Sequence, residues 1–401
     1  MNVRITPSTA RGRVTAPPSK SMAHRALICG ALSADSVISN LAWSEDMKAT
    51  LRCLAALGTQ VDQDGDTVRL GGLTPATTAP TEPLDCHESG STLRFMIPLC
   101  LLSDKPVTLT GAERLMQRPL GVYADLCTAT GLRFEQSGNT LTVCGPLRGG
   151  RYAMPGDVSS QFISGLLFAL PLAKEDSVLT ITGKAESLSY IDLTLKALTD
   201  FGIILYRTAD AILIPGGQTY RPRTTAVEGD WSNAAFLDAF NLLGGDVTVE
   251  GLDENSSQGD RVYRELFARL DAGESSPIDL ADCPDLAPIL FAVAAAKHGG
   301  VFDGTARLKI KESDRAVAMQ AELAKCGIPV TVEDNRVTVH KATLYAPDSI
   351  IDGHNDHRIV MAMSVLCSLV GGEIAGAEAV TKSYPNFFDD IIKLGIQVNT
   401  Q

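Results

Sequence analysis

The chain has 401 residues, of which 45% are hydrophobic and 20% charged, so we expect two hydrophobic cores rather than one. Its formal net charge of -12 opposes broad binding to nucleic acids or anionic membranes, although a few cations can still gather around a small anionic substrate. No apolar run is long enough to span a bilayer and the N-terminus lacks an apolar signal core, so the expected location is cytoplasmic.

The first predicted elements are a helix over 21–33, a short strand that ends at Asn40, a second helix that ends at Gly58, and a hairpin over 59–72. The helix over 21–33 is apolar on nearly every side, which is typical of a helix buried in a core. The second helix is apolar on one face only. This order, buried helix, strand, amphipathic helix and hairpin, defines a structural unit.

The same unit returns five times along the chain. Further buried helices are predicted at 91–103, 159–173, 232–245, 285–296 and 357–372. Turns that suit a positive φ recur at Asn40, Gly111, Gly183, Gly251, Gly304 and Gly376. The amphipathic helices close at Gly58, Gly131, Gly202, Gly273, Gly327 and Gly395. Further hairpins follow at 132–145, 203–217 and 328–341. Six repeats predict an α/β protein of two similar domains with three repeats each.

Every predicted buried helix begins with polar residues. If the three helices of a domain are parallel, their N-termini share one end, where unpaired N–H groups and the helix dipoles attract anions. Cationic residues fall at these helix starts or in the loops that follow the turns, at Lys20, Arg25, Arg94, Arg118, Lys311, Arg315, Arg358 and Lys382. Such clustering in an acidic protein indicates a site for a ligand rich in phosphate and carboxylate.

Two acids stand among these cations, Asp285 and Glu312, and acids there would weaken anion binding. We interpret them as proton-transfer groups. Two simpler alternatives stay open: Asp285 as a helix cap or first-turn acid, and Glu312 as a complement to a helix dipole. His357 has an equally plausible structural role, and Tyr190 by itself suggests core packing.

No motif for a metal or cofactor was found. The nine cysteines form no C-x-x-C pair and are expected to be reduced and mostly buried, and the histidines lack partners at metal-ligand spacing. The glycine-rich loops of nucleotide-binding proteins are also missing from the sequence. We therefore expect an enzyme without metal or organic cofactor.

At the helix starts and loops the chain resembles the 5-enolpyruvylshikimate-3-phosphate (EPSP) synthase family, the 3-phosphoshikimate 1-carboxyvinyltransferases. The matching segments run in order along nearly the whole chain: PPSKSMAHRAL, ESGSTLRF, QRPLG, SSQFISGLL, SLSYIDLTL, EGDWSNAAF, CPDLAP, KIKESDR, NDHRIVMA and KSYPNF. The resemblance implies an inverse α/β prism built of βαβαββ repeats. It also implies one domain of residues 1–17 plus 229–401, a second of residues 18–228, substrates bound in the cleft between them, and a monomer.

The resemblance further implies transfer of the enolpyruvyl group of phosphoenolpyruvate to the 5-hydroxyl of shikimate 3-phosphate, on the pathway to chorismate and aromatic amino acids. The residues implied for shikimate 3-phosphate are Lys20, Ser21, Arg25, Ser159, Ser160, Gln161, Ser187, Tyr190, Asp285 and Lys311. Those implied for phosphoenolpyruvate are Lys20, Gly90, Arg118, Gln161, Arg315, Arg358 and Lys382. The implied catalytic residues are Asp285, Glu312, Lys20 and His357.

Two positions depart from the family's usual pattern. Glu88 stands where many members have asparagine, and Arg307 also replaces a frequent asparagine. Gly90 is retained, and the resemblance implies that a small residue there leaves room for the inhibitor glyphosate. Two alternatives remain: the sister transferase acting on UDP-N-acetylglucosamine, whose loop cysteine is missing from GAERLMQRPLG, and a non-enzymatic repeat scaffold.

Overall fold

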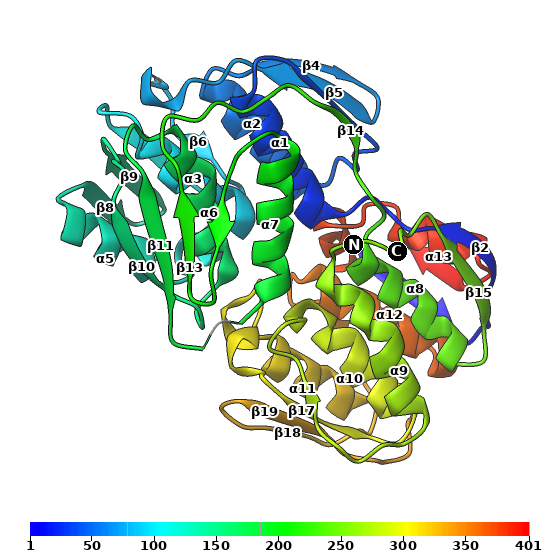
Figure 1. Ribbon diagram of the computed structural model, residues 1–401. Coiled ribbons are helices and arrows are strands. Elements are labelled where there is room, and N and C mark those ends of the chain that lie inside the picture. The colour runs from blue at the N-terminus through cyan, green and yellow to red at the C-terminus, as the bar shows by residue number, and fades with distance from the viewer. Residues whose placement is uncertain (78, 185, 401) are drawn as a thin grey trace. The chain divides into compact units, whose positions relative to one another are not determined.

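The computed structural model describes residues 1–77, 79–184 and 186–400 and divides into two compact units (Figure 1). Unit 1 consists of Met1–Ser19 and Glu228–Gln401, and unit 2 of Lys20–Val227. These divisions fall one or two residues from the boundaries expected from the sequence. Each unit has its own hydrophobic core, as a chain of this length requires.

Unit 2 is built from three four-stranded sheets with the same internal order. Each begins with a parallel pair and ends with an antiparallel hairpin. The sheets are β14(Thr224–Ala226)-β3(Ser36–Ser39)-β5(Thr67–Gly71)-β4(Gln60–Asp64), β6(Leu84–Asp85)-β7(Val107–Thr110)-β9(Thr140–Cys144)-β8(Arg133–Ser137) and β10(Arg151–Pro155)-β11(Ser177–Thr182)-β13(Ala211–Ile214)-β12(Tyr206–Arg207). The buried helices are α1 (Lys20–Leu32), α3 (Gly90–Cys100) and α6 (Ser160–Ala169), and the amphipathic ones are α2 (Glu45–Ala56), α5 (Gly121–Thr130) and α7 (Leu188–Asp200), with a short α4 (Glu113–Met116) before α5.

Unit 1 repeats this architecture with the N-terminal strands included. Its sheets are β16(Ile278–Asp279)-β17(Gly300–Asp303)-β19(Arg336–Val339)-β18(Val330–Val332), β20(Ile351–Asp352)-β21(Gly372–Ala375)-β1(Asn2–Thr6)-β22(Gln397–Thr400) and the two-stranded β15(Asp246–Glu250)-β2(Arg11–Thr15). Strand β1 is antiparallel to both neighbours, and β2, blue in Figure 1, lies beside the green β15. The N-terminus therefore completes sheets of the C-terminal repeats.

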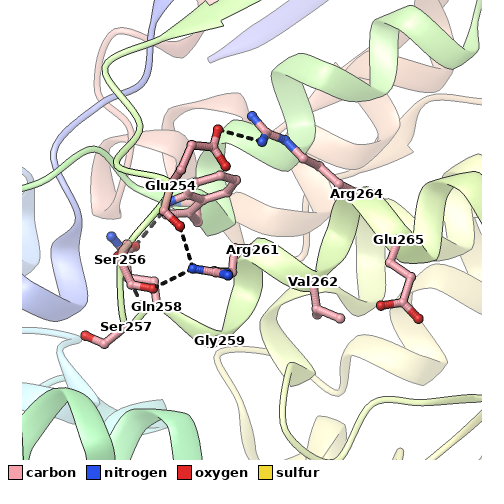
Figure 2. A pocket seen from close by; sticks show the side chains of 10 residues that line it. Glu254, Ser256, Ser257, Gln258, Gly259, Arg261, Val262, Arg264 and Glu265 are labelled. Carbon is pink, nitrogen blue, oxygen red and sulfur yellow. Dashed lines mark hydrogen bonds and ion pairs between the residues drawn. The ribbon is translucent and has the colours of Figure 1, made fainter.

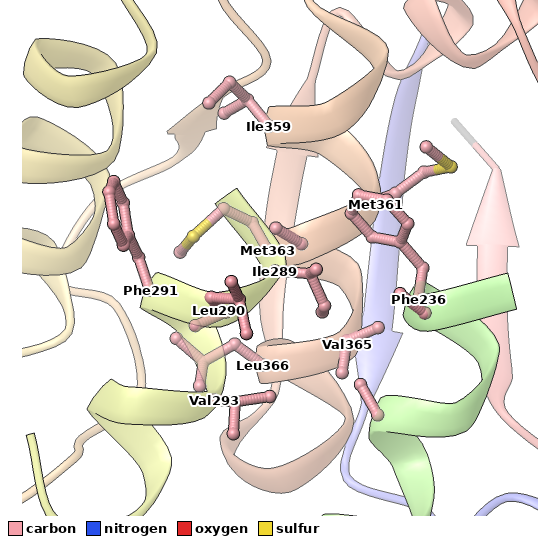
Figure 3. Close-up of a cluster of buried hydrophobic side chains, with 14 of the residues drawn as sticks. Phe236, Ile289, Leu290, Phe291, Val293, Ile359, Met361, Met363, Val365 and Leu366 are labelled. Atoms are coloured by element: carbon pink, nitrogen blue, oxygen red, sulfur yellow. The ribbon is translucent and has the colours of Figure 1, made fainter. Parts of the chain in front are cut away.

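The core of unit 1 forms around three buried helices, α8 (Trp231–Leu242), α10 (Ala287–Ala296) and α12 (His357–Val370). Figure 3 shows Phe236 of α8 and Phe291 of α10 among side chains of α12 such as Met361. Amphipathic helices α9 (Tyr263–Asp271), α11 (Arg315–Lys325) and α13 (Phe387–Lys393) complete the repeats. Helices that are apolar on all sides are found in the interior because no face of them favours water.

Side chains at the starts of the buried helices bond to one another within each unit. In unit 1, Arg358 Nη1 at the start of α12 donates to Ser232 Oγ of α8 at 2.7 Å and to the Asp285 carbonyl, just before α10, at 3.1 Å. In unit 2, Gln161 of α6 contacts Ser91 of α3 at 2.8 Å. The N-termini of all three buried helices of unit 1, and those of α3 and α6 in unit 2, therefore lie at one end of their unit, as their polar starts predicted.

All six closing glycines have a positive φ, between 70° and 102°, as predicted for helix C-termini. Among the turn positions the prediction of a positive φ fails at Gly111, which is not in the left-handed region. Glycine is required there for another reason: a Cβ would lie 2.9 Å from the His87 carbonyl oxygen and 2.8 Å from Leu115 Cδ2. Close approach of the backbone, rather than the backbone angle, explains this glycine.

The nine cysteines are free thiols, eight of them buried, in agreement with the sequence-based expectation. Across residues 1–77, 79–184 and 186–400 we find no helix with the length and apolarity needed to cross a bilayer.

Candidate active site

Arg315, the first residue of α11, is the centre of a charged cluster in unit 1. Its side chain is only 1% exposed and contacts three carboxylates. Nη1 lies 2.8 Å from Asp285 Oδ1, Nη2 lies 2.7 Å from Glu312 Oε2, and Nε lies 2.9 Å from Asp356 Oδ2. The planar guanidinium suits this arrangement because its donors point in fixed directions.

Asp285 joins three cations of this cluster. Besides Arg315 it pairs with Arg358 Nη2 at 3.0 Å and Lys311 Nζ at 3.3 Å. Burial raises the pKa of Asp285, but the opposing charges of Arg358, Lys311 and Arg315 outweigh burial and hold it well below its ordinary value. Asp285 is not a helix cap, because the capping positions here belong to Cys283 and Leu286, but it is an acid in the first turn of the 3₁₀ helix Pro284–Leu286, so that part of the simpler alternative holds.

Lys311 and Glu312 lie in the loop between a 3₁₀ turn (Ala306–Ile310) and α11. Burial lowers the pKa of Lys311, and the Asp285 carboxylate partly opposes that shift. The N-cap of α11 is Asp314, whose side chain accepts from the Val317 N–H at 3.3 Å. Glu312 therefore precedes the helix and lies outside its first turn, so a dipole-complementing role does not account for it.

Further residues of unit 1, among them the predicted His357 and Lys382, lie beside this cluster. Asp356 caps α12 and also accepts from Ser313 Oγ at 3.0 Å. His357, whose side chain is 1% exposed, has Nδ1 3.9 Å from Asp356 Oδ1. Lys382 Nζ donates to the Asn355 carbonyl oxygen at 2.6 Å. The predicted site residues of unit 1 thus lie at or near the starts of α10, α11 and α12, with Lys382 bonded to the turn before α12.

In unit 2, Arg25 is buried, and among the residues that the structure describes it is held by neutral oxygens rather than by a carboxylate. Nε donates to Thr194 Oγ1 at 2.8 Å, Nη1 to the Ser21 carbonyl at 2.6 Å and Nη2 to the Tyr190 carbonyl at 2.9 Å. The guanidinium also lies over the Phe95 ring. Burial lowers the pKa of Arg25 to about 10. Tyr190, predicted only weakly from the sequence, therefore helps to orient this cation through its backbone.

A second group in unit 2 joins α3 to α6. Arg94 Nη1 donates to Gln161 Oε1 at 2.7 Å. Gly90 is next to this group: a Cβ there would lie 2.6 Å from Arg118 Nη1 and 3.2 Å from Arg94 Nη1. Glycine at 90 thus leaves space for two guanidinium groups.

The remaining predicted residues of unit 2 lie at helix starts. Lys20, at the start of α1, pairs with Asp46 Oδ2 at 2.9 Å. Ser159 caps α6 by accepting from the Gln161 N–H at 3.3 Å, and Ser160 is the first residue of that helix. Ser187 precedes α7 with a positive φ of 54°.

Sequence reasoning missed three residues of these clusters: Asp46, Ser313 and Asp356. Asp46 and Asp356 neutralise predicted cations, and each stands at or near a helix start, where an acid has an ordinary structural explanation. Their positions beside Lys20 and Arg315 were the available signal. Of the two departures, Arg307 is buried and donates to the Ala281 carbonyl at 2.6 Å, and Glu88 is half-buried just before the α3 cap.

A pocket of about 550 Å³ lies elsewhere in unit 1, on the loop before α9. Figure 2 shows Arg264 directed at Glu254, and Arg261 directed at the backbone of the same loop. None of the predicted site residues lines it. In the part of the chain that the structure describes, no three His, Cys, Asp or Glu side chains are grouped to hold a metal ion.

The fold and the charged clusters together define an α/β protein of two units. Each unit repeats one structural motif three times, and charged side chains cluster near the starts of its buried helices. A family model described as EPSP synthase (3-phosphoshikimate 1-carboxyvinyltransferase) matches residues 5–391. A Clostridium kluyveri protein named 3-phosphoshikimate 1-carboxyvinyltransferase is 38% identical over 99% of this chain and 98% of its own length. One of the same name from Clostridioides difficile is 34% identical over the same shares. The chain therefore belongs to the EPSP synthase family.

Solved structures agree on the fold. An EPSP synthase structure from Acinetobacter baumannii superposes with a TM-score of 0.79 at 24% identity, with all of both chains covered. A second structure from that organism gives the same score at 22% identity. At these identities the likeness shows the fold alone. The matches do not favour the alternative of a UDP-N-acetylglucosamine transferase.

Proposed function

We propose that this protein transfers the enolpyruvyl group of phosphoenolpyruvate to the 5-hydroxyl of shikimate 3-phosphate and releases phosphate. The observation that carries the proposal is the cluster around Arg315, in which three cations and three carboxylates share one buried network. Cations alone would serve an anion-binding protein. Acids held among them point to proton transfer in the same place.

In unit 1, Arg315 and Arg358 are proposed to bind the carboxylate of phosphoenolpyruvate. Both guanidinium groups are buried and held by Asp285, so an incoming carboxylate competes with that residue for the same donors. Losing part of these pairs raises the pKa of Asp285 from its depressed value and makes it a stronger base. Asp285 would then accept the proton of the attacking 5-hydroxyl only after the second substrate is bound.

Glu312 is proposed to protonate the methylene carbon of phosphoenolpyruvate, with Lys20 and His357 assisting in proton movement. Its carboxylate bonds to Arg315 Nη2, so the same competition releases it to hold a proton. Addition of the hydroxyl oxygen to the phosphate-bearing carbon gives a tetrahedral intermediate. Phosphate then leaves, and a proton returns from the new methyl group to the enzyme. Positioning and electrostatics would supply most of the rate.

In unit 2, Ser21 and Arg25 are proposed to bind the carboxylate of shikimate 3-phosphate beside Tyr190. Ser159, Ser160, Gln161 and Ser187, together with Lys311, are proposed for that substrate. Lys20, Arg118, Gln161 and Lys382 are proposed for the phosphate of phosphoenolpyruvate, in the space left by Gly90. The support is chemical: Arg25 is buried and oriented by neutral oxygens, so its charge is available to an anion.

We further propose that substrates bind between the two units, that the protein works as a monomer in the cytoplasm, and that it binds neither nucleic acid nor membrane. Its acidic net charge and its small-molecule chemistry support this. No metal or organic cofactor is proposed, because each step uses a side chain of the chain itself.

The test is phosphate release on mixing the protein with both substrates, with each substrate omitted in turn and with chelator added. We expect release only when both are present, and no effect of the chelator. Release with UDP-N-acetylglucosamine in place of shikimate 3-phosphate would establish the sister activity instead. A folded protein that releases phosphate with neither acceptor would overturn the proposal and leave the repeat scaffold as the alternative.

A further inference from the structure

The turn between β20 and α12 contains two consecutive residues in the left-handed region. His354 has a φ of 50° and Asn355 a φ of 51°, and neither is glycine. Left-handed backbone costs free energy in such residues, so the surrounding contacts must maintain it. The turn leads directly into Asp356 and Arg358, and its Asn355 carbonyl oxygen accepts from Lys382 Nζ at 2.6 Å. Three groups of the unit 1 cluster therefore depend on where this turn lies.

The turn is fastened to α11 through a buried carboxylate. Glu322 of α11 has a side chain that is 2% exposed, and its Oε1 lies 2.8 Å from His354 Nε2. Its Oε2 accepts from the Asp352 N–H at 2.9 Å and from Lys325 Nζ at 2.7 Å. The Asp352 carboxylate in turn accepts from the His354 N–H at 2.8 Å. Both the backbone and the ring of His354 are therefore bonded.

We propose that His354 is a positioning residue: its bond to Glu322 fixes the turn that holds Lys382 and the start of α12 in place for phosphoenolpyruvate. The proposal rests on the proposed function of that cluster. His354 itself touches no reacting atom in this scheme. Its effect reaches Lys382 through the Asn355 carbonyl, and Arg358 through the cap residue Asp356.

The charges around His354 make this bond dependent on pH. Glu322 raises the pKa of His354, burial opposes the shift, Asp352 adds to it, and Lys325 on the same helix reduces it. For Glu322, burial is outweighed by the bonds from His354, Lys325 and the Asp352 N–H, so its pKa is lowered. Because the folded pKa of His354 is raised, the ion pair is complete below the ordinary histidine value and is lost as pH rises through the raised value.

The decisive experiment compares His354→Gln and His354→Leu with the wild-type protein between pH 6 and 9. Glutamine keeps a neutral donor and leucine removes it. We expect the KM for phosphoenolpyruvate to rise about tenfold in the leucine variant, with kcat changed much less. The glutamine variant should have the wild-type KM for phosphoenolpyruvate at pH 9 and a higher KM than the wild type at pH 6. His340→Gln is the control, because that histidine of unit 1 is exposed and its ring bonds to the Thr331 hydroxyl, away from the turn.

A second readout does not depend on turnover. Hydrogen exchange at residues 352–358 should be faster in His354→Leu than in the wild type and unchanged in His340→Gln. If the wild type releases phosphate and both His354 variants keep its KM at every pH, the positioning role is overturned. If the wild type releases no phosphate, the proposed function fails instead, and exchange at 352–358 alone decides whether His354 fastens the turn.

Discussion

The cluster around Arg315 in unit 1 and the surroundings of Arg25 in unit 2 hold their buried cations in different ways. In unit 1, Arg315, Arg358 and Lys311 each contact a carboxylate, and Asp285 is common to all three. In unit 2, Arg25 is oriented by a hydroxyl and two carbonyl oxygens and lies over the ring of Phe95.

This difference indicates a division of labour. A cation held by neutral oxygens keeps its full charge for a ligand, so Arg25 of unit 2 suits anion binding. A cation that already pairs with an acid gives up part of that pairing when an anion arrives, and the acid's proton affinity then changes. Unit 1 is therefore suited to linking substrate binding to proton transfer.

The sharpest way to test this division is Glu312→Gln. Glutamine keeps the bond to Arg315 but removes the titratable group. We expect kcat to fall by about 10²- to 10⁴-fold, the usual contribution of a general acid, with substrate affinities nearly unchanged. The exposed Glu333→Gln serves as the matched control in the same unit. Unchanged turnover in Glu312→Gln would exclude this residue as the proton donor.

Asp285→Asn should change phosphoenolpyruvate binding and turnover in opposite directions. Removing the shared carboxylate leaves Lys311, Arg315 and Arg358 with fewer internal partners, so phosphoenolpyruvate should bind at least as tightly. Turnover should fall by roughly 10²-fold or more, because the proposed base is lost. Equilibrium titration and steady-state kinetics on the same preparation check both parts. Weaker binding of phosphoenolpyruvate would show that Asp285 helps to hold this substrate rather than competing with it for the cations.

Arg315→Met should affect stability more than the matching arginine change in unit 2. It leaves Asp356, whose side chain is fully buried, without its cation, and removing one partner of such a pair costs about 3–5 kcal/mol. Urea unfolding of this variant and of Arg25→Met gives the comparison. Arg25 is held by a hydroxyl and two carbonyl oxygens, so its loss leaves no buried carboxylate behind and should cost less unfolding free energy. Equal losses of unfolding free energy in the two variants would contradict the proposed difference between the two sites.

Gly90→Ala should give the smallest of these effects. The new Cβ would displace the Arg118 guanidinium, the far end of a flexible side chain, so the fold should tolerate it. We expect the KM for phosphoenolpyruvate to rise about tenfold, equivalent to about 1.4 kcal/mol, and the affinity for shikimate 3-phosphate to remain unchanged. Glyphosate, which the family resemblance places in the same space, should inhibit the wild type more strongly than the variant. Equal inhibition of both proteins would argue against that placement.

Much of the fold could be predicted because glycines and apolar helical segments recur in the same order in every repeat. The closing glycines have the expected backbone, whereas Gly111 failed because contact with His87, far along the chain, decides its role. The cations were found because they stand at helix starts. Their acidic partners were harder to predict, because each looks like an ordinary helix acid in the sequence. Only the folded chain shows the pairs Lys20–Asp46, Arg315–Asp356 and His354–Glu322. Such pairings depend on tertiary contacts that no local pattern contains.

The most direct test of the division between units is the dissociation constant of shikimate 3-phosphate for Arg25→Met and Arg358→Met, measured by titration without phosphoenolpyruvate. We predict that the unit 2 variant loses about 100-fold in affinity, equivalent to about 2.7 kcal/mol, and that the unit 1 variant stays within about threefold of the wild type. Equal losses in the two variants, or a loss only in Arg358→Met, would contradict the account.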